Sequence, residues 1–462
     1  MIDFQSKGHE IAAAVRNGKI SATEAVRVAL ARIDAINPQL NAFTAITSDR
    51  ARARAAAIDQ AKDEGKPIGP LAGVPFAVKN LFDIAGLATL AGSKINRDHA
   101  PARADAVLVQ KLEAAGAILV GALNMGEYAY DFTGENVHYG PSRNPHDPTC
   151  MAGGSSGGSG TAVAAGMVPL ALGSDTNGSI RVPSSLCGLF GLKPTFGRLS
   201  RHGSFPFVAD LDHLGPMARS TLDLALSYDA MQGPDANDAW CAQRDVEAVT
   251  GKLDAGIDGL RIAVADSYFA EQGDAEAHEA VAAFAKELKT ERRVTIPEAG
   301  RGRAAAYVIT TVEGANLHRE RLKTRANDFD PAVRDRFLAG MMLPADWLVQ
   351  AHRFRRWYQA RVAEVFKEVD IILAPATPRV APKLGQVMMT LNGVEMPVRA
   401  NLGLFTQPIS AIGLPVVAAP YADRKGKLPI GVQIIAAPWK EELALRVARR
   451  LEQSGIAASF AV

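Results

Sequence analysis

Apolar residues recur at helical spacing near the start of the chain. The segment AVRVALARIDAI (25–36) follows Ser21 and Glu24, which have the spacing of a capping box at a helix N-terminus. We expect this helix to end at the Asn-Pro pair 37–38, because proline disfavours helical angles in the residue before it. A stretch rich in Ala and Arg predicts a second helix over roughly 48–64.

Short apolar runs of strand type alternate with helical stretches further along. Runs at 74–78 and 117–121 flank a helix-like segment at 103–115, and a third run covers 168–172. Near the C-terminus, DIILAPATP follows an amphipathic helix over 352–369, and LPVVAAPY and LPIGVQIIAAP precede a final helix, EELALRVARRLEQSG. This alternation predicts α/β layers.

Between residues 235 and 350 charged helical stretches dominate and strand-like runs are few. No repeat of fixed period interrupts the chain. We therefore expect one α/β domain over 1–462, made of N-terminal helices (1–65), a catalytic core (66–230), a variable helical region (235–350) and a C-terminal part of the core (351–462).

Composition and charge mainly exclude other classes of protein. The 462 residues are 48% hydrophobic and 22% charged, with a net charge of +2, so no overall field favours nucleic acid or an anionic membrane. No run of 18 apolar residues and no secretory signal stand out, and we expect a cytoplasmic protein. Three cysteines without metal-ligand spacing and no HExxH motif predict reduced thiols and no metal or other cofactor.

The stretch GGSSGGSG (153–160) has the composition of a flexible linker, but apolar TAVAAGMVPLALG follows it at once. No GK[ST] follows the glycines, so it is not a phosphate-binding loop. It matches the nucleophile-elbow pattern G-x-S-x-G formally, although RNPHDPTCMA before it is a poor strand. The motif alone leaves its role open.

A second stretch, GSDTNGSIRVPSSLCG (173–188), narrows the possibilities. Ser179 lies in a loop between a strand-like run and a helix, where several backbone N–H groups would point at one spot, as in an oxyanion hole. A serine nucleophile needs a base. Besides histidine, a buried neutral lysine can serve, and Lys79 ends the apolar run GVPFAVK, where a strand would deliver it desolvated.

Lys79 in GVPFAVKN, Ser155 in GGSSGGSG and Ser179 in GSDTNGSIRVPSSLCGLFGLKPT occur in an order that resembles the amidase signature family. LPIGVQIIAAP is similar to the closing strand of that family. The resemblance covers nearly the whole chain and is weakest over 235–350. It implies a large mixed twisted sheet flanked by helices on both faces, with a helical insertion.

The same resemblance implies a Ser–cis-Ser–Lys triad. Ser179 would attack the amide carbonyl, and Ser155, preceded by a cis peptide bond, would relay the proton to Lys79. Ser156 would support the triad through a hydrogen bond. The resemblance implies no cofactor.

Backbone N–H groups from Thr176, Asn177, Gly178 and Ser179 would form the oxyanion hole. The family usually has glycine where this chain has Asn177. Asparagine tolerates left-handed backbone angles, so the hole can persist. The Asn177 side chain either contacts the substrate or is a tolerated variant.

Other residues are candidates for substrate binding. AHRFRRWYQ resembles an amidotransferase helix in which Arg355 would bind a carboxylate as a bidentate fork; otherwise Arg355 solvates one helix face. Tyr128, Tyr130 and Asp131 lie where the family lines its pocket, although the tyrosines suit core packing equally well. Three histidines either contact substrate or are structural: His138, His318 and His352.

Within the family, residues 173–216 resemble the 1-carboxybiuret hydrolases of cyanuric acid degradation. That resemblance implies a small carboxylated biuret as the substrate and ammonia as a product. It also implies a small helical partner subunit similar to the C subunit of the amidotransferases. We therefore expect a hetero-oligomer or a homodimer that does not bind nucleic acid directly. The alternatives are the A subunit of a Glu-tRNA(Gln)/Asp-tRNA(Asn) amidotransferase and another small-amide amidase.

Overall fold

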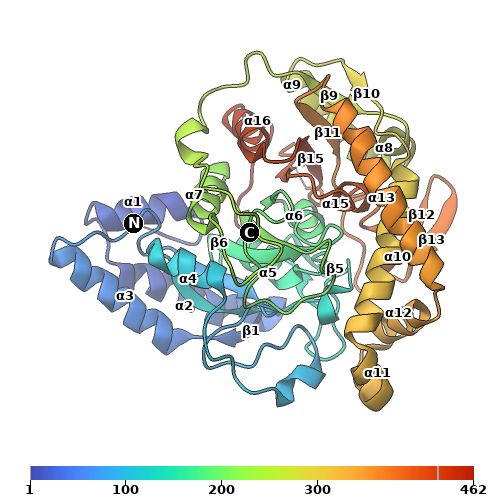
Figure 1. Ribbon diagram of the computed structural model, residues 1–462. Helices are drawn as coiled ribbons and strands as arrows, with labels where there is room; N and C mark the ends of the chain where they lie inside the picture. Colours follow the sequence, from blue (N-terminus) through green and yellow to red (C-terminus); the bar gives the residue numbers. More distant parts are fainter. Residues whose placement is uncertain (1, 424–425) are drawn as a thin grey trace.

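A large mixed sheet forms the centre of the molecule (Figure 1). The computed structural model describes residues 2–423 and 426–462, and within these residues the sheet has eleven strands. Parallel pairing joins β2 to β3 and β6, and β9 to β10 and β11, while the other neighbours are antiparallel. In sheet order the strands are β1 (Phe43–Ile46), β3 (Ile118–Leu123), β2 (Pro75–Lys79), β6 (Leu170–Asp175), β8 (His213–Ala218), β7 (Phe190–Lys193), β14 (Val416–Pro420), β15 (Gly431–Ala436), β11 (Ile371–Pro375), β9 (Ile262–Ala265) and β10 (Arg293–Val294).

Side chains of the strands alternate between the two faces of the sheet, and the described residues form three apolar cores. In β2, Phe76 and Val78 join one core and Ala77, on the opposite face, joins another. Helices α4 (Val107–Ala114), α7 (Thr221–Met231), α9 (Ala275–Glu287) and α16 (Glu441–Gln453) cover the first face. The second face is covered by α2 (Ala22–Leu40), α3 (Ser48–Asp63), α5 (Gly157–Ala164) and α6 (Arg181–Cys187).

A group of helices packs together at one side of the sheet, at the right of Figure 1: α10 (Ala299–Leu317), α12 (Pro331–Met341) and α13 (Ala345–Val365). Shorter helices are α1 (Gly8–Arg16), α8 (Tyr268–Glu271), α11 (Arg319–Arg325), α14 (Val398–Asn401) and α15 (Gln407–Ser410). Two small ribbons pair β4 (Arg143–Asn144) with β5 (Asp147–Met151) and β12 (Met388–Leu391) with β13 (Val394–Pro397). Among the described helices, none has both the length and the apolar character that crossing a membrane requires.

The first long helix begins as predicted but ends later. Ser21 accepts a hydrogen bond from the backbone N–H of Glu24, which caps α2. The predicted end at Pro38 is wrong, because α2 continues to Leu40. Proline removes one helical hydrogen bond there, but the last turn is kept because Leu40 is buried and the Asn37 side chain accepts the N–H groups of residues 42 and 43.

The predicted α/β fold, with a mixed sheet between helical layers, is confirmed. The segment 235–350 is mostly helical, but it also supplies β9 and β10 to the sheet edge, which the apolar pattern did not predict. These strands are short, and β9 pairs with β11, more than a hundred residues later in the chain. Strand formation here depends on that distant partner rather than on a local pattern.

Candidate active site

Lys79 is the last residue of β2 and is completely buried. Its Nζ lies 2.6 Å from Ser155 Oγ and 2.8 Å from Ser174 Oγ. Burial lowers the pKa of Lys79 to about 7, against the charges of three nearby aspartates. A substantial fraction of this lysine is therefore neutral at neutral pH, and its lone pair is then available to the Ser155 hydroxyl proton.

The glycine-serine stretch is a tightly packed loop and helix start. The Gly154–Ser155 peptide bond is cis, as the resemblance implied, and residues 152–164 are all buried. A Cβ on Gly154 would lie 2.7 Å from a carboxylate oxygen of Asp131, so only glycine fits. Ser156 Oγ donates to the carbonyl of Ser174 (3.2 Å) and accepts its N–H (3.3 Å). Ser156 thereby fixes the Ser155 loop to β6, the strand that leads to Ser179.

Residues Thr176 to Ser179 form the loop between β6 and α6. Gly178 has φ +139°, and a Cβ there would lie 2.1 Å from Thr406 Oγ1. Thr406 Oγ1 also donates to the carbonyl of Asn177 at 2.7 Å, which pins the loop. The tolerance of asparagine for left-handed angles is not used at position 177, because in the described loop the positive φ is at Gly178. Asn177 therefore contributes through its side chain.

A buried ion pair that the sequence analysis missed supports this loop. Asp175 and Arg181, on either side of Ser179, are both fully buried and lie 2.9 Å apart between Oδ1 and Nη2. Burial opposes the charge of Asp175, but the Arg181 guanidinium outweighs it and holds the pKa of that carboxyl well below its usual range. Arg181 Nη1 also donates to Gln433 Oε1 of β15 at 2.7 Å. The nucleophile loop is thus bound to a distant strand.

Ser179 lines a narrow pocket with a volume of about 10 Å³. That is room for about one water molecule, so the lining must move before any substrate can enter. Asn177 Nδ2 donates to Thr310 Oγ1 at 2.8 Å, whereas Asn177 Oδ1 is buried and has no partner among the described residues. The lining residues are Ala129, Tyr130, Asp131, Phe132, Thr176, Asn177, Ser179, Phe207, Tyr307, Thr310, Arg336 and Gln407.

Two of the three residues expected at the pocket from MGEYAYDFTGEN lie there. Tyr130 and Asp131 line it, and Asp131 also pairs with Arg399 at 2.8 Å. The structure does not bring Tyr128 into the described lining: its hydroxyl donates to Asn96 and its ring packs on His318, with centroids 4.0 Å apart. Tyr128 is a core residue, the second of the two readings that the sequence allowed.

Arg355 is also absent from the residues described as lining this pocket. Its Nη1 lies 3.1 Å from Asp210 Oδ2, and its other donors reach the backbone carbonyls of Asp210 and Ala411. The fork is therefore occupied by the protein itself. The pocket instead contains Arg336 of α12, a residue that no sequence motif had singled out.

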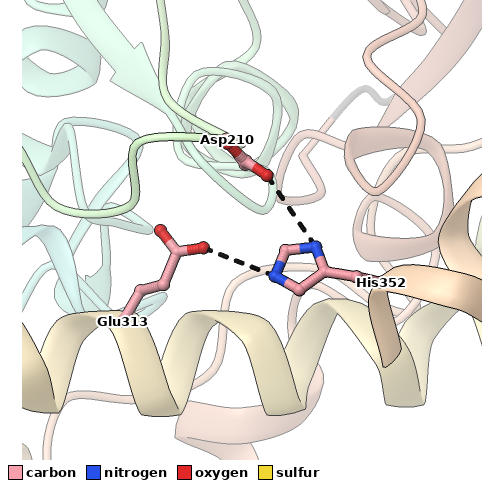
Figure 2. A group of neighbouring side chains, drawn as sticks. All are labelled: Asp210, Glu313 and His352. Carbon is pink, nitrogen blue, oxygen red and sulfur yellow. Dashed lines mark ion pairs between the residues drawn. The ribbon is translucent and has the colours of Figure 1, made fainter. Parts of the chain in front are cut away.

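Of the three histidines left open, two are clearly structural. His138 pairs with Glu127 at 2.9 Å, and His318 is buried among aromatic rings, where burial lowers its pKa to about 3. His352 lies between two carboxylates (Figure 2). Its Nδ1 is 3.8 Å from Asp210, and its Nε2 is 3.9 Å from Glu313.

Asp210, Glu313 and His352 have the ligand types of a metal site, and one ligand atom from each lies within 4.8 Å of the others. The two ring nitrogens of His352 face different carboxylates, Nδ1 that of Asp210 and Nε2 that of Glu313 (Figure 2). Arg355 already donates to Asp210. Together with Arg355 these three residues form a charge network, in which burial raises the pKa of Glu313 to about 7.

Comparisons with known proteins agree with these motifs. The family model described as "Amidase" matches residues 24–445. The AtzE subunit of the 1-carboxybiuret hydrolase of Pseudomonas sp. (strain ADP) is 54% identical over 97% of this chain and 98% of its own length. The A subunit of the glutamyl-tRNA(Gln) amidotransferase of Pseudomonas aeruginosa is 36% identical over 96% of both chains.

Comparison with solved structures also identifies proteins related to an s-triazine catabolic enzyme and to the amidotransferase A subunits. One solved structure is described as an unexpected vestigial protein complex that reveals the evolutionary origins of an s-triazine catabolic enzyme. It superposes on this chain with a TM-score of 0.97 and is 54% identical in sequence, over 98% of this chain and all of its own. The A subunit of the glutamyl-tRNA(Gln) amidotransferase of Thermotoga maritima has a TM-score of 0.80 and 28% identity over 96% of this chain and 98% of its own. The resemblance predicted from the motifs is confirmed.

Proposed function

Since the chain belongs to the amidase family, we propose that it hydrolyses the terminal amide of a small carboxylated biuret and releases ammonia. The observation that carries this proposal is the 54% identity, over nearly the whole of both chains, to a 1-carboxybiuret hydrolase subunit. The amidotransferase A subunits are more distant, at 35–37% identity, and remain the alternative.

The mechanism proceeds through an acyl-enzyme. Ser179 Oγ attacks the terminal carbonyl as its proton passes to Ser155, and the Ser155 proton passes to neutral Lys79. Backbone N–H groups of residues 176–179 stabilise the oxyanion. Lys79 returns the proton through Ser155 to the departing nitrogen, which leaves as ammonia. Water then hydrolyses the acyl-enzyme by the same proton path, giving a dicarboxylated urea.

The pocket favours a substrate that is small and rich in amide groups. Asn177 Oδ1 is an acceptor without a partner among the described residues, so an N–H group of the substrate would satisfy it. Gln407, whose Oε1 accepts from Arg303 at 2.8 Å, adds a second fixed amide to the lining.

We further propose a small helical partner subunit for this chain. A solved relative is described as a protein complex. Large apolar side chains are exposed on α12, α13 and their connection, including Met342 (83% exposed) and Trp347 (54% exposed). Exposed apolar groups gathered in one region are typical of a protein–protein interface.

Ammonia release tests the proposed function. The panel consists of freshly prepared 1-carboxybiuret, biuret, allophanate, malonamate and glutamine, with the Ser179→Ala variant as the control for contaminating activity. We expect the largest kcat/KM for the carboxylated biuret and none above background in the variant. A preference for glutamine would instead support the amidotransferase alternative.

A further inference from the structure

We infer that Arg336 of α12 binds the carboxylate of the substrate, the role that the sequence had given to Arg355. This inference rests on the proposed function, because it concerns the same pocket. It adds the site that recognises the charged end of the substrate. Three observations support it: where Arg336 lies, what holds it, and what it does not pair with.

Arg336 and Ser179 line the same pocket. The guanidinium carbon of Arg336 lies 3.4 Å from the centroid of the Tyr130 ring and 6.0 Å from that of Tyr307. Its Nη1 donates to the carbonyl of Tyr130 at 2.8 Å. A cation held over aromatic rings and by one hydrogen bond is fixed in place while other N–H groups remain available.

Other arginines near the pocket already have protein acceptors. Arg355 pairs with Asp210 and Arg399 with Asp131, while Arg303 donates to Asn401 and Gln407. In contrast, no acidic side chain in the described chain forms an ion pair with Arg336. The half-buried guanidinium of Arg336 lacks the acidic partner that Arg355 and Arg399 have and the side-chain amide acceptors that Arg303 has, and a substrate carboxylate would supply a partner.

The rest of the lining would not compete for that carboxylate. Asp131 is the acidic residue in the described lining, and its charge is balanced by Arg399. Arg336 is the cation among the lining residues. A molecule with an amide at Ser179 and a carboxylate at Arg336 would therefore engage both residues of one pocket lining.

A stable pair of substrates isolates the carboxylate. Malonurate replaces the labile N-carboxy nitrogen of carboxybiuret by a methylene, and acetylurea is the same molecule without the carboxylate; both can release ammonia from the terminal amide. For Arg336→Gln we expect kcat/KM for malonurate to fall roughly 100-fold, equivalent to about 3 kcal/mol. We expect less than about a threefold change for acetylurea, and partial recovery in Arg336→Lys, which keeps the charge but loses the fork.

The matched control is Arg334→Gln. Arg334 lies on the same helix, pairs with Asp335 and is outside the described pocket lining, so its loss changes the net charge equally. It should leave both substrates unaffected. Equal losses for malonurate and acetylurea in Arg336→Gln, with the fold intact by circular dichroism, would overturn the inference. So would a selective loss for malonurate in Arg355→Gln but not in Arg336→Gln.

Binding separates this inference from the proposed function. In a Ser179→Ala background, calorimetry measures malonurate affinity without turnover, and Arg336→Gln should weaken it by a similar factor. If the wild type binds malonurate through Arg336 but releases no ammonia from any carboxylated urea, the proposed function fails and the carboxylate site stands. An unchanged malonurate affinity in the Ser179→Ala, Arg336→Gln double variant would overturn the inference that Arg336 binds the carboxylate.

Discussion

At the scale of single residues, the proposed mechanism makes the reaction depend on the protonation state of Lys79. Its pKa is lowered to about 7 by burial, and only the neutral amine can accept the Ser155 proton. Below pH 7 the protonated form dominates, so kcat/KM should fall tenfold per pH unit, and above pH 7 it should reach a plateau. The measurement is kcat/KM for malonurate from pH 5.5 to 9.5, where the substrate carboxylate stays ionised.

Glu313 supplies the matched control for this pH profile, because burial raises its pKa to about 7 as well. Glu313→Gln should leave the profile unchanged, since this residue takes no part in the proton path. A flat profile in the wild type would exclude Lys79 as the base. A profile that becomes flat only in Glu313→Gln would assign the titration to the network of Figure 2.

The triad makes a second prediction at this scale. Lys79→Ala and Ser155→Ala should each lower kcat by about 10³- to 10⁵-fold, and the double variant should lose little more, because the proposed mechanism places the two residues in one proton path. Single-turnover ammonia release measures all three variants. Multiplicative losses in the double variant would show that the residues act independently.

At the scale of elements, the loop between β6 and α6 depends on Gly178. Gly178→Ala places a Cβ 2.1 Å from Thr406 Oγ1, at a φ that other residues rarely adopt. We expect a loss of about 1–3 kcal/mol in the free energy of unfolding and a larger relative loss of activity, because the oxyanion hole is displaced. Urea denaturation and ammonia release measure the two effects.

The control for this prediction is Gly256→Ala. Gly256 also has a positive φ, +74°, but nothing lies within 4 Å of the position of an added Cβ. It should therefore lose about 1 kcal/mol or less from the backbone alone and keep its activity. Similar losses of stability and activity in both variants would show that the contact with Thr406 is unimportant.

The elements near the motifs could be predicted because their signals are local. The capping box at Ser21 and the apolar run before Lys79 each sit within a few residues of the structure they specify. Strands β9 and β10 lack such signals, since a short edge strand forms only when a distant partner is present. The end of α2 was mispredicted for the same reason: the helix continues past Pro38 because Leu40 is buried by residues that the local sequence does not reveal.

The residues of the candidate site also differ in whether a local sequence motif could predict them. The amidase class and the fold, which the motifs predicted, are confirmed, and the structure brings Lys79 and Ser155 within 2.6 Å. Arg355 and Arg336 look alike in the sequence, as arginines on amphipathic helices. What distinguishes them is Asp210, which lies 145 residues before Arg355 and occupies its guanidinium. A contact of this kind has no local signature.

At the scale of the whole molecule, the proposed partner subunit should stabilise this chain. A partner that binds the folded state raises its stability by mass action, and covering the apolar side chains near Met342 and Trp347 lowers self-association. Light scattering and thermal unfolding should therefore show a less stable, more associated chain when it is produced alone than when it is produced with its partner. A monodisperse and fully active chain on its own would contradict this prediction.

The order of strands in the sheet also has a consequence for biosynthesis. β14 and β15, from the last tenth of the chain, lie in the middle of the sheet, between β7 and β11. Within the described sheet, β14 and β15 alone connect the six strands from β1 to β7 with the three strands β11, β9 and β10, so we expect the two groups to stay unconnected until residues 416–436 have been synthesised. Gln433, which accepts from Arg181 beneath the nucleophile loop, arrives with them. A chain that stops short of β15 would carry Lys79, Ser155 and Ser179 and still lack the Gln433 contact to Arg181, so we expect activity only after β15 has joined the sheet.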